Sequence, residues 1–319
     1  MSQKEKVLQA LTDMASKIER DSKHIYRNPE TGEMYQGVTS VSSIIPKDWL
    51  AQWGAKEAVK ALGYSDYEDT AVAQEMWRKI KTCKSVQEYM SILKEVKGAG
   101  GRKSKQAMVD GKAGHLWLET YIQTKIDGQS KVPPIPNSML VRPITQFLEW
   151  EMNNVDSWYA SESMVVRPDK RYAGQLDAIA QLKNGFVSLI DFKFATNISE
   201  DYYLQTAGYS ACFEPYGILF DQRIIIRLPK TLEKEEWNEE DHKYVHIPND
   251  VEVRVIPTQY EVDRDAFFHA LPVKGWINYV LKLSGKQVFK ETKEKPQKPV
   301  ETTYENYPEE KSDSSKIPF

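Results

Sequence analysis

Three consecutive stretches in the middle of the chain predict β-strands separated by turns. The stretches cover residues 161–167, 173–182 and 186–192, and each carries a run of apolar residues. The segments between them, Pro168-Asp169-Lys170 and Lys183-Asn184-Gly185, consist of residues that favour tight turns. The chain is therefore expected to build its core on a β-sheet.

Segments on both sides of these strands predict helices. Residues 4–19 place apolar side chains on one stripe of a helix, including Val7, Leu11 and Met14. We expect a hairpin over residues 24–34, helices over 66–97, 109–125, 141–154, 200–213 and 263–283, and strands over 223–228 and 251–256. The predicted fold class is α/β: a central mixed β-sheet of roughly four or five strands, flanked by helices, with a helical N-terminal elaboration.

Changes in composition along the 319 residues predict three parts. Residues 1–108 would form the helical elaboration and residues 109–285 the core. Residues 286–319 are rich in Lys, Glu, Pro, Thr and Ser and hold few large apolar residues. Such a composition cannot bury enough apolar surface to fold, so this tail is expected to be disordered.

Overall composition excludes several classes of protein. The chain has only two cysteines, which rules out a four-cysteine iron–sulfur or zinc site and argues against a disulfide scaffold. Its formal net charge of −3 gives no global basic field, so any nucleic acid would have to bind a local patch. Neither a membrane-spanning run nor a signal peptide is evident, and we expect a soluble cytoplasmic protein without a membrane partner, in the bacterial host if phage-encoded.

The predicted strands carry a pattern of acidic and basic residues that suits phosphodiester hydrolysis. Gly174-Gln175-Leu176-Asp177 is followed fourteen residues after Asp177 by Asp191-Phe192-Lys193. Two carboxylates can hold a divalent cation, and Lys193 lies on the same strand face as Asp191. Asp177 and Asp191 are thus predicted ligands of Mg²⁺ or Mn²⁺, and Lys193 is the predicted water-positioning or transition-state residue. The alternative is a salt-bridged set on a sheet edge.

Further candidates flank this pattern on both sides. His115 is a candidate metal ligand, and an imidazole suits Mn²⁺ better than Mg²⁺; the alternative is a core histidine with its hydrogen bonds satisfied. Glu119, one helical turn away, would bind a second ion or position the first shell of ligands. Glu162, on the strand before Asp177, would point the same way. Gln205 and Tyr209, one turn apart, would hold the substrate backbone or the lysine.

A basic segment precedes the predicted His115 helix. Gly98-Ala99-Gly100-Gly101 is expected to break the preceding helix and to start a flexible loop. The segment from Lys94 to Lys112, both included, has six basic and two acidic residues. Either the loop is simply solvated, or it contacts nucleic-acid phosphates. The candidate contacts are Arg102, Lys103, Lys105 and Lys112.

These motifs, in this order, resemble the RecB-type exonuclease branch of the PD-(D/E)XK nuclease superfamily. The resemblance spans roughly residues 36–270, and its first part, Tyr35 to Val41, is similar to the start of phage exonucleases and mitochondrial genome maintenance exonucleases. It implies a restriction-endonuclease-like core and a catalytic Lys193. It also implies a metal held by His115, Asp177, Asp191 and the carbonyl of Phe192, with Gln205 and Tyr209 as the accessory motif. Many relatives carry an iron–sulfur cluster held by four cysteines, which this chain cannot hold because it has only two cysteines.

The resemblance implies a DNA exonuclease of phage or bacterial recombination, repair or replication that leaves 5′-phosphate and 3′-hydroxyl ends. Three alternatives stay open: an endonuclease of the same fold, a non-catalytic DNA-binding or recruitment protein, and RNA as the substrate. Residues Ile317-Pro318-Phe319 resemble the tip of bacterial single-stranded DNA-binding proteins. They are a candidate docking segment for a replication or repair protein.

Overall fold

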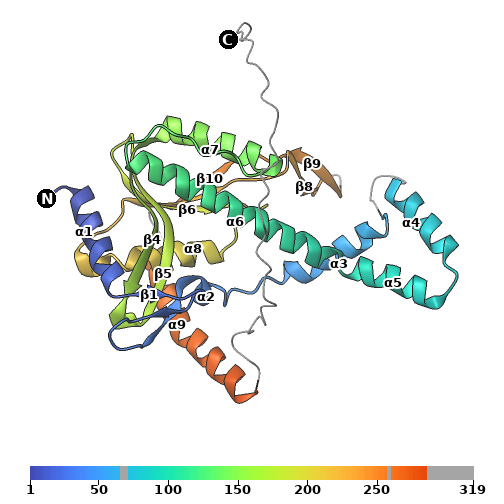
Figure 1. Cartoon of the computed structure of the whole chain (residues 1–319), viewed down its shortest axis with the longest axis horizontal. Helices are drawn as coiled ribbons and strands as arrows, with labels where there is room; N and C mark the ends of the chain where they lie inside the picture. Colours follow the sequence, from blue (N-terminus) through green and yellow to red (C-terminus); the bar gives the residue numbers. More distant parts are fainter. Residues whose placement is uncertain (65–70, 241, 257–259, 286–319) are drawn as a thin grey trace, which may run out of the picture. The chain divides into compact units, whose positions relative to one another are not determined.

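A mixed eight-stranded β-sheet forms the centre of the fold (Figure 1). The structure is a computed structural model that describes residues 1–64, 71–240, 242–256 and 260–285. The strand order is β1-β2-β3-β5-β6-β7-β10, with β4 paired to β5. The strands are β1 (Glu19–Arg20), β2 (Tyr26–Arg27), β3 (Met34–Gly37), β4 (Val155–Arg167), β5 (Tyr172–Leu182), β6 (Val187–Lys193), β7 (Gln222–Arg227) and β10 (Glu252–Ile256).

The sheet is mixed because two of its pairings are parallel. β3 runs parallel to β5 and β6 runs parallel to β7, whereas the other neighbours are antiparallel. The predicted α/β class is therefore confirmed, but the sheet has eight strands rather than four or five. The difference arises because the short strands β1–β3 of the N-terminal region join the edge of β5 through the Gln36–Tyr172 pairing.

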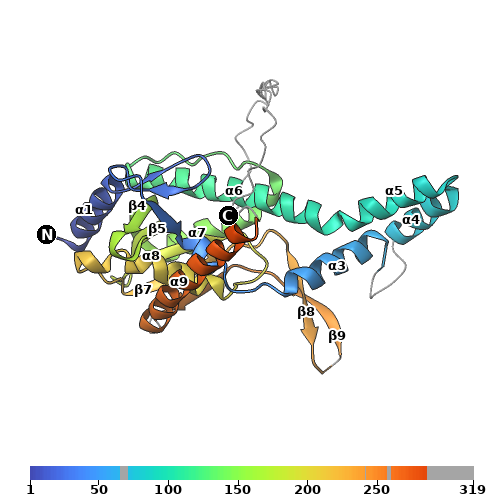
Figure 2. The same cartoon turned by 90° about the horizontal axis from the view of Figure 1, so that it is seen from below.

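Helices lie on both faces of the sheet (Figure 2), and an apolar core covers each face. One contains residues of α1 (Gln3–Ser16), α8 (Asp201–Ala211) and α9 (Tyr260–Leu283). The other contains residues of α6 (Ala99–Ile126) and α7 (Val141–Asn154), packed around the fully buried Phe147. Burial on both faces explains why β7 and most of β6 are buried throughout rather than at alternate residues.

In the described part of the chain, four helices lie between β3 and α6: α2 (Val38–Ser42), α3 (Trp49–Ala61), α4 (Ala71–Thr82) and α5 (Val86–Lys97). The segment predicted as one helix over 66–97 contains two helices, because Ser85 caps α5 by accepting a hydrogen bond from the backbone N–H of Glu88 at 3.2 Å. Residues 65–70 lie outside the described part of the chain. α3 and α5 both contact α6.

The prediction of a flexible loop after Gly98 is wrong. Gly98 ends α5, but α6 begins at the next residue and runs without interruption for 28 residues. Glycines usually disfavour a helix, yet the site of Gly100 needs a small residue because a Cβ there would lie 3.2 Å from the Cα of Gly54 in α3. The residues that follow have high helix propensity, so the basic segment is helical.

Smaller differences concern the ends of strands and one missed hairpin. β4 begins at Val155, six residues before the predicted start. The two-stranded sheet of β8 (Glu233–Asn238) and β9 (Lys243–Pro248) was not predicted. Short 3₁₀ helices lie at Ser138–Leu140, Pro168–Lys170 and Glu214–Tyr216. The expected hairpin over 24–34 is present as the β2–β3 pairing.

The chain divides into two compact units, residues Met1–Gly275 and Trp276–Phe319. The predicted boundary at residue 108 stays a prediction. The predicted disordered tail and its Ile317-Pro318-Phe319 end lie outside the described residues. Among the described helices, none combines the length and apolar character needed to cross a bilayer.

Candidate active site

Three acidic side chains lie in a row across three neighbouring strands. The register of the antiparallel β4–β5 ladder places Glu162 opposite Asp177. The β5–β6 ladder pairs Ala178 with Ile190, and the same register carried one residue further places Asp177 opposite Asp191. These positions bring the three acids close enough for the charges of Asp177 and Asp191 to act on Glu162. Such like charges repel one another unless a cation lies among them.

Strands β5 and β6 separate at this row of acids. Their ladder ends at Ala178 and Ile190, so Asp177 and Asp191 have no ladder pairing with each other. Instead, Oδ2 of Asp177 accepts a hydrogen bond from the backbone N–H of Phe192 at 2.7 Å. The side chain of Asp177 thus occupies the opening between the strands, and its orientation is set by the backbone of the Asp191-Phe192-Lys193 motif.

Glu162 has an unusual backbone conformation for a strand residue. Its φ of +43° lies in the left-handed region, which a residue with a Cβ occupies at a cost of about 1–3 kcal/mol. The side-chain amide of Gln175 donates to the carbonyl of Glu162 at 3.1 Å and so helps to hold this conformation. Strain of this kind persists where the surrounding structure enforces it, and it is common at functional sites.

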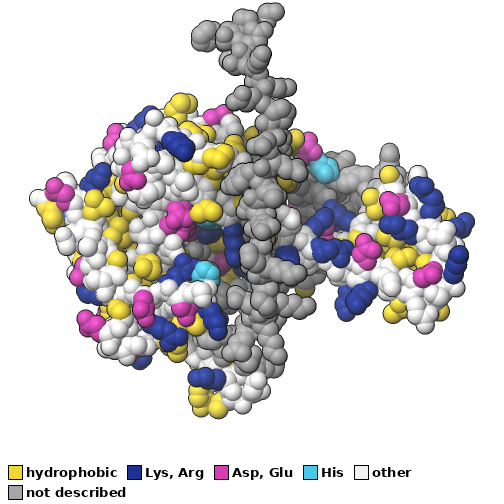
Figure 3. All heavy atoms as spheres, viewed as in Figure 1, with side chains coloured by type: hydrophobic (Ala, Val, Ile, Leu, Met, Phe, Trp, Pro, Cys, Tyr) yellow, Lys and Arg dark blue, Asp and Glu magenta, His cyan; other side chains and the backbone are white. Residues whose placement is uncertain are grey.

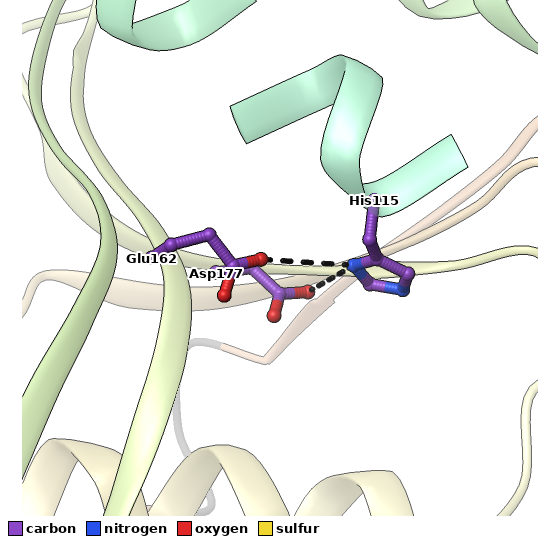
Figure 4. Close-up of side chains that lie close together, drawn as sticks. All are labelled: His115, Glu162 and Asp177. Carbon is purple, nitrogen blue, oxygen red and sulfur yellow. Dashed lines mark ion pairs between the residues drawn. The ribbon is translucent and has the colours of Figure 1, made fainter. Parts of the chain in front are cut away.

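His115 reaches the acids from helix α6. Its Nδ1 lies 3.6 Å from Oδ2 of Asp177 and 4.0 Å from Oε1 of Glu162, and Figure 4 shows the three side chains converging. The ligand atoms of these three residues all lie within 4.8 Å of one another. The imidazole packs edge-on against the ring of Phe194, with ring centroids 5.5 Å apart.

Gly114, the residue directly before His115, allows α6 to come this close. A Cβ at Gly114 would lie 2.4 Å from the ring of Phe194, well inside van der Waals contact. A Cβ at Gly111 would meet nothing within 4 Å. The close approach of α6 that places His115 therefore depends on Gly114 and not on Gly111.

Asp191 and Lys193 form a buried ion pair beside this group. Nζ of Lys193 lies 2.7 Å from Oδ2 of Asp191, whose side chain is 1% exposed. The other carboxylate oxygen of Asp191, Oδ1, is buried and has no hydrogen-bond donor within the described residues. Nζ of Lys193 also lies 4.8 Å from the ring centroid of Tyr202. Buried oxygens without donors are expensive, and they are the groups that a bound cation would satisfy.

The carboxylates have raised pKa values because they are buried together. Burial, reinforced by repulsion from Asp177 and then from Glu119, raises the pKa of Glu162 to about 8. Burial raises the pKa of Asp191 to about 6 although the Lys193 cation opposes it. The pKa of Asp177 is also raised by burial, against the effects of Lys193 and the Phe192 N–H. The site therefore favours protonation of its acids until a cation compensates them.

The pKa values of His115 and Lys193 are shifted in opposite directions. Burial, together with the Lys193 cation, lowers the pKa of His115 to about 4, so the imidazole is neutral at pH 7 and able to act as a ligand. Burial also disfavours the charge of Lys193, but the carboxylates of Asp191 and Asp177 outweigh it and raise its pKa. Lys193 is therefore a cation at neutral pH.

The Gln205–Tyr209 pair lies behind the acids, in the protein interior. Nε2 of Gln205 donates to the hydroxyl of Tyr209 at 3.1 Å, and both side chains are buried. Asp191 and Asp177 contribute to a pKa of Tyr209 that burial raises well above its ordinary value. A Cβ at Gly174 would lie 2.5 Å from the Tyr209 ring, so the glycine of Gly174-Gln175-Leu176-Asp177 makes room for it. These positions suit a role in supporting the site.

Of the other predicted site residues, Glu119 is half-buried and acts on Glu162 through its charge but is not in the group of three. Asp191 also lies outside that group at the 4.8 Å limit. For Phe192 the structure gives a role to the backbone N–H, and the carbonyl ligand stays a prediction.

Sequence reasoning missed Arg20 of strand β1. Its charge lowers the pKa of Glu162, so it lies close to the acidic row. It donates to Oε1 of Gln175, the same side chain that holds the backbone of Glu162. Arg20 belongs to a two-residue strand outside every motif, and no local pattern marks it. Only the pairing of the N-terminal hairpin with the sheet reveals it.

The predicted basic contacts all lie on α6 and are exposed. Lys103 forms an ion pair with Glu57 of α3, and Nη2 of Arg102 donates to the carbonyl of Glu95 at 2.9 Å. Lys112 precedes the histidine of the site by less than one helical turn. In the space-filling view, Lys and Arg side chains gather over the α3–α6 region (Figure 3).

The chain matches no protein-family model, and no curated protein matches it. Among solved structures it is similar to the crystal structure of SSO0001, with 12% sequence identity over 51% of this chain and 73% of that chain. The TM-score of that match is 0.24, too low to support any argument about fold or function.

Proposed function

We propose that this protein is a metal-dependent nuclease that hydrolyses phosphodiester bonds in DNA, most simply as an exonuclease. One observation carries the proposal. His115, Glu162 and Asp177 come from α6, β4 and β5, yet their ligand atoms lie within 4.8 Å of one another, beside the buried Asp191–Lys193 pair. No packing requirement explains why a fold would gather two carboxylates and a histidine at one point with a third buried carboxylate beside them.

The residues fit a divalent cation. The donor set of one neutral imidazole and carboxylate oxygens suits Mn²⁺, and it accepts Mg²⁺ with water completing the shell. His115, Glu162 and Asp177 would hold the ion, with Asp191 as a further carboxylate whose buried Oδ1 has no hydrogen-bond donor among the described residues. Such an ion polarises a phosphoryl oxygen and makes water more acidic.

The chain's own groups would supply the rest of the chemistry. Lys193 is held by Asp191 as a cation, which suits it to orient the attacking water and to stabilise negative charge on the phosphate rather than to act as a base. Gln205 and Tyr209 would keep the β5 backbone and the acids in place. Glu119 would act through its charge on Glu162.

The exposed basic residues of α6 support a nucleic-acid substrate. Arg102, Lys103, Lys105 and Lys112 lie on the helix that carries His115, so a strand bound along them would lead to the acids. The choice of DNA over RNA, the exonuclease mode, the 5′-phosphate and 3′-hydroxyl products and a role in recombination, repair or replication rest on the family resemblance. The recruitment role of Ile317-Pro318-Phe319 concerns residues outside the described part of the chain.

The test is cleavage of end-labelled single- and double-stranded DNA with Mn²⁺ or Mg²⁺. We expect cleavage that requires the metal and disappears in Lys193→Gln. The matched control is Lys183→Gln, at the exposed turn between β5 and β6 of the same hairpin, which should leave cleavage unchanged. A wild-type protein that is inert on every substrate with both metals would refute the proposal.

Two substrate comparisons separate the remaining alternatives. An exonuclease leaves a circular single strand intact and degrades the linear form, whereas an endonuclease cuts both. Oligonucleotides of one sequence made as DNA and as RNA show which sugar the site accepts, because only RNA carries the 2′-hydroxyl.

A further inference from the structure

The guanidinium of Arg20 lies close to the acidic row, but its hydrogen bond goes to Gln175 and not to one of the three carboxylates. Arg20 is half-buried, and one of its five N–H donors, on Nη1, donates to Oε1 of Gln175. Its Nε–H is buried and, within the described residues, has no hydrogen-bond partner. A buried donor without a partner is unfavourable, so the conformation is explained best by a ligand that would accept from it.

Neighbouring groups hold Arg20 in this position. The guanidinium lies over the ring of Tyr26, 5.8 Å from its centroid. Gln175 accepts from Arg20 with its Oε1 and donates from its Nε2 to the carbonyl of Glu162. Gln175 therefore links the guanidinium to the strained residue of the acidic row, and it is two residues from Asp177 on the same face of β5.

Charge gives the site an asymmetry that suits an anionic ligand. Lys193 forms an ion pair with Asp191 at one end of the row. At the Glu162 end, Arg20 interacts with the carboxylate through space, and its hydrogen bond goes to a neutral amide. An arginine kept from a carboxylate by a neutral partner retains its capacity to bind a phosphate, for which the planar guanidinium is well shaped.

We propose that Arg20 binds a phosphate oxygen of the nucleic-acid strand in the acidic site and thereby positions that strand. The inference rests on the proposed nuclease function and adds to it a substrate-binding residue supplied by the N-terminal hairpin. The competing explanation is that Arg20 serves only as a counter-charge to Glu162. The two explanations predict different effects on DNA binding and on metal binding.

The experiment measures binding of a short fluorescein-labelled single-stranded DNA in Ca²⁺ at several salt concentrations, by anisotropy. For Arg20→Gln we expect Kd to rise roughly tenfold or more, as for the loss of a charged hydrogen bond. The slope of log Kd against log salt should fall by about 0.7, as for the loss of one contact to a single strand. Arg20→Lys should keep the slope with an intermediate Kd.

The matched control is Arg27→Gln, on β2 of the same hairpin. The Arg27 side chain is 37% exposed and lies 3.9 Å from Asp21, so its loss should change neither Kd nor slope. Mn²⁺ affinity, titrated on the same variants without DNA, tests the counter-charge explanation. Thermal melts show whether each variant is folded.

Each outcome decides the proposal. A higher Kd and a lower slope in Arg20→Gln alone, with Mn²⁺ affinity within about twofold of the wild type, support it. An unchanged Kd overturns it, and so does a change in Mn²⁺ affinity with an unchanged salt slope. If the wild type cleaves DNA while Arg20→Gln binds normally, only this inference fails; if the wild type neither binds nor cleaves DNA, the nuclease proposal fails with it.

Discussion

Removal of one charge from the acidic row should stabilise the metal-free protein, and Glu162→Gln is the most informative change. Glutamine keeps the shape of the side chain but has no charge to repel Asp177. The pKa of Glu162 is raised from its ordinary 4.5 to about 8 because the folded state disfavours the carboxylate. Each pH unit corresponds to about 1.4 kcal/mol, so the whole shift corresponds to about 5 kcal/mol.

The expected stabilisation by Glu162→Gln is smaller than this value of about 5 kcal/mol, and it increases with pH. Neighbouring acids can take up part of the proton, so we expect about 2 kcal/mol. Below pH 4.5 the glutamate is protonated in both the folded and the unfolded states, and Glu162→Gln should change little. As pH rises toward about 8, the unfolded chain releases the proton more readily, and the wild type loses stability relative to the variant.

The assay is urea denaturation in EDTA at about pH 4.5 and about pH 8.5, followed by far-UV circular dichroism. The control is Asp156→Asn, an exposed acid on the same strand, which should change the free energy of unfolding by less than about 0.5 kcal/mol. Addition of Mn²⁺ should reverse the order, because the cation stabilises only a site with its carboxylates. A Glu162→Gln variant that is less stable than the wild type at the higher pH in EDTA would contradict the assigned repulsion.

Two further predictions concern packing around the site. Gly114→Ala should lower stability by about 1–3 kcal/mol and weaken Mn²⁺ binding, because the added Cβ would overlap the Phe194 ring. Gly111→Ala, the control, should be neutral or stabilising by up to about 1 kcal/mol. Thermal melts and Mn²⁺ titration compare the two variants, and equal effects would contradict a contact between Gly114 and Phe194. Tyr209→Phe leaves the buried Nε2 of Gln205 without its acceptor and should destabilise by about 1–3 kcal/mol in urea denaturation; no change would show that the pair contributes nothing.

Local patterns were sufficient for most of the helices and strands. The helix over 141–154 was predicted to the residue, since its apolar stripe and its ends are both local features. The glycines at 98–101 led to the wrong prediction of a loop. The site of Gly100 needs a small residue because α3, far away in the sequence, packs against it. The number of N-terminal strands in the sheet was predicted too low, because strands of two residues have no periodicity to detect.

The alignment of the three acids is encoded locally. The β4–β5 and β5–β6 connections are short turns, and a turn sets the register of its two strands, so Glu162, Asp177 and Asp191 are opposed by their distances from those turns. The other groups that meet the acids depend on long-range packing. His115 arrives because Gly114 lets α6 pack against Phe194, and Arg20 arrives because a distant hairpin joins the sheet at β3. Those contacts join side chains far apart in the chain, and no local spacing encodes them.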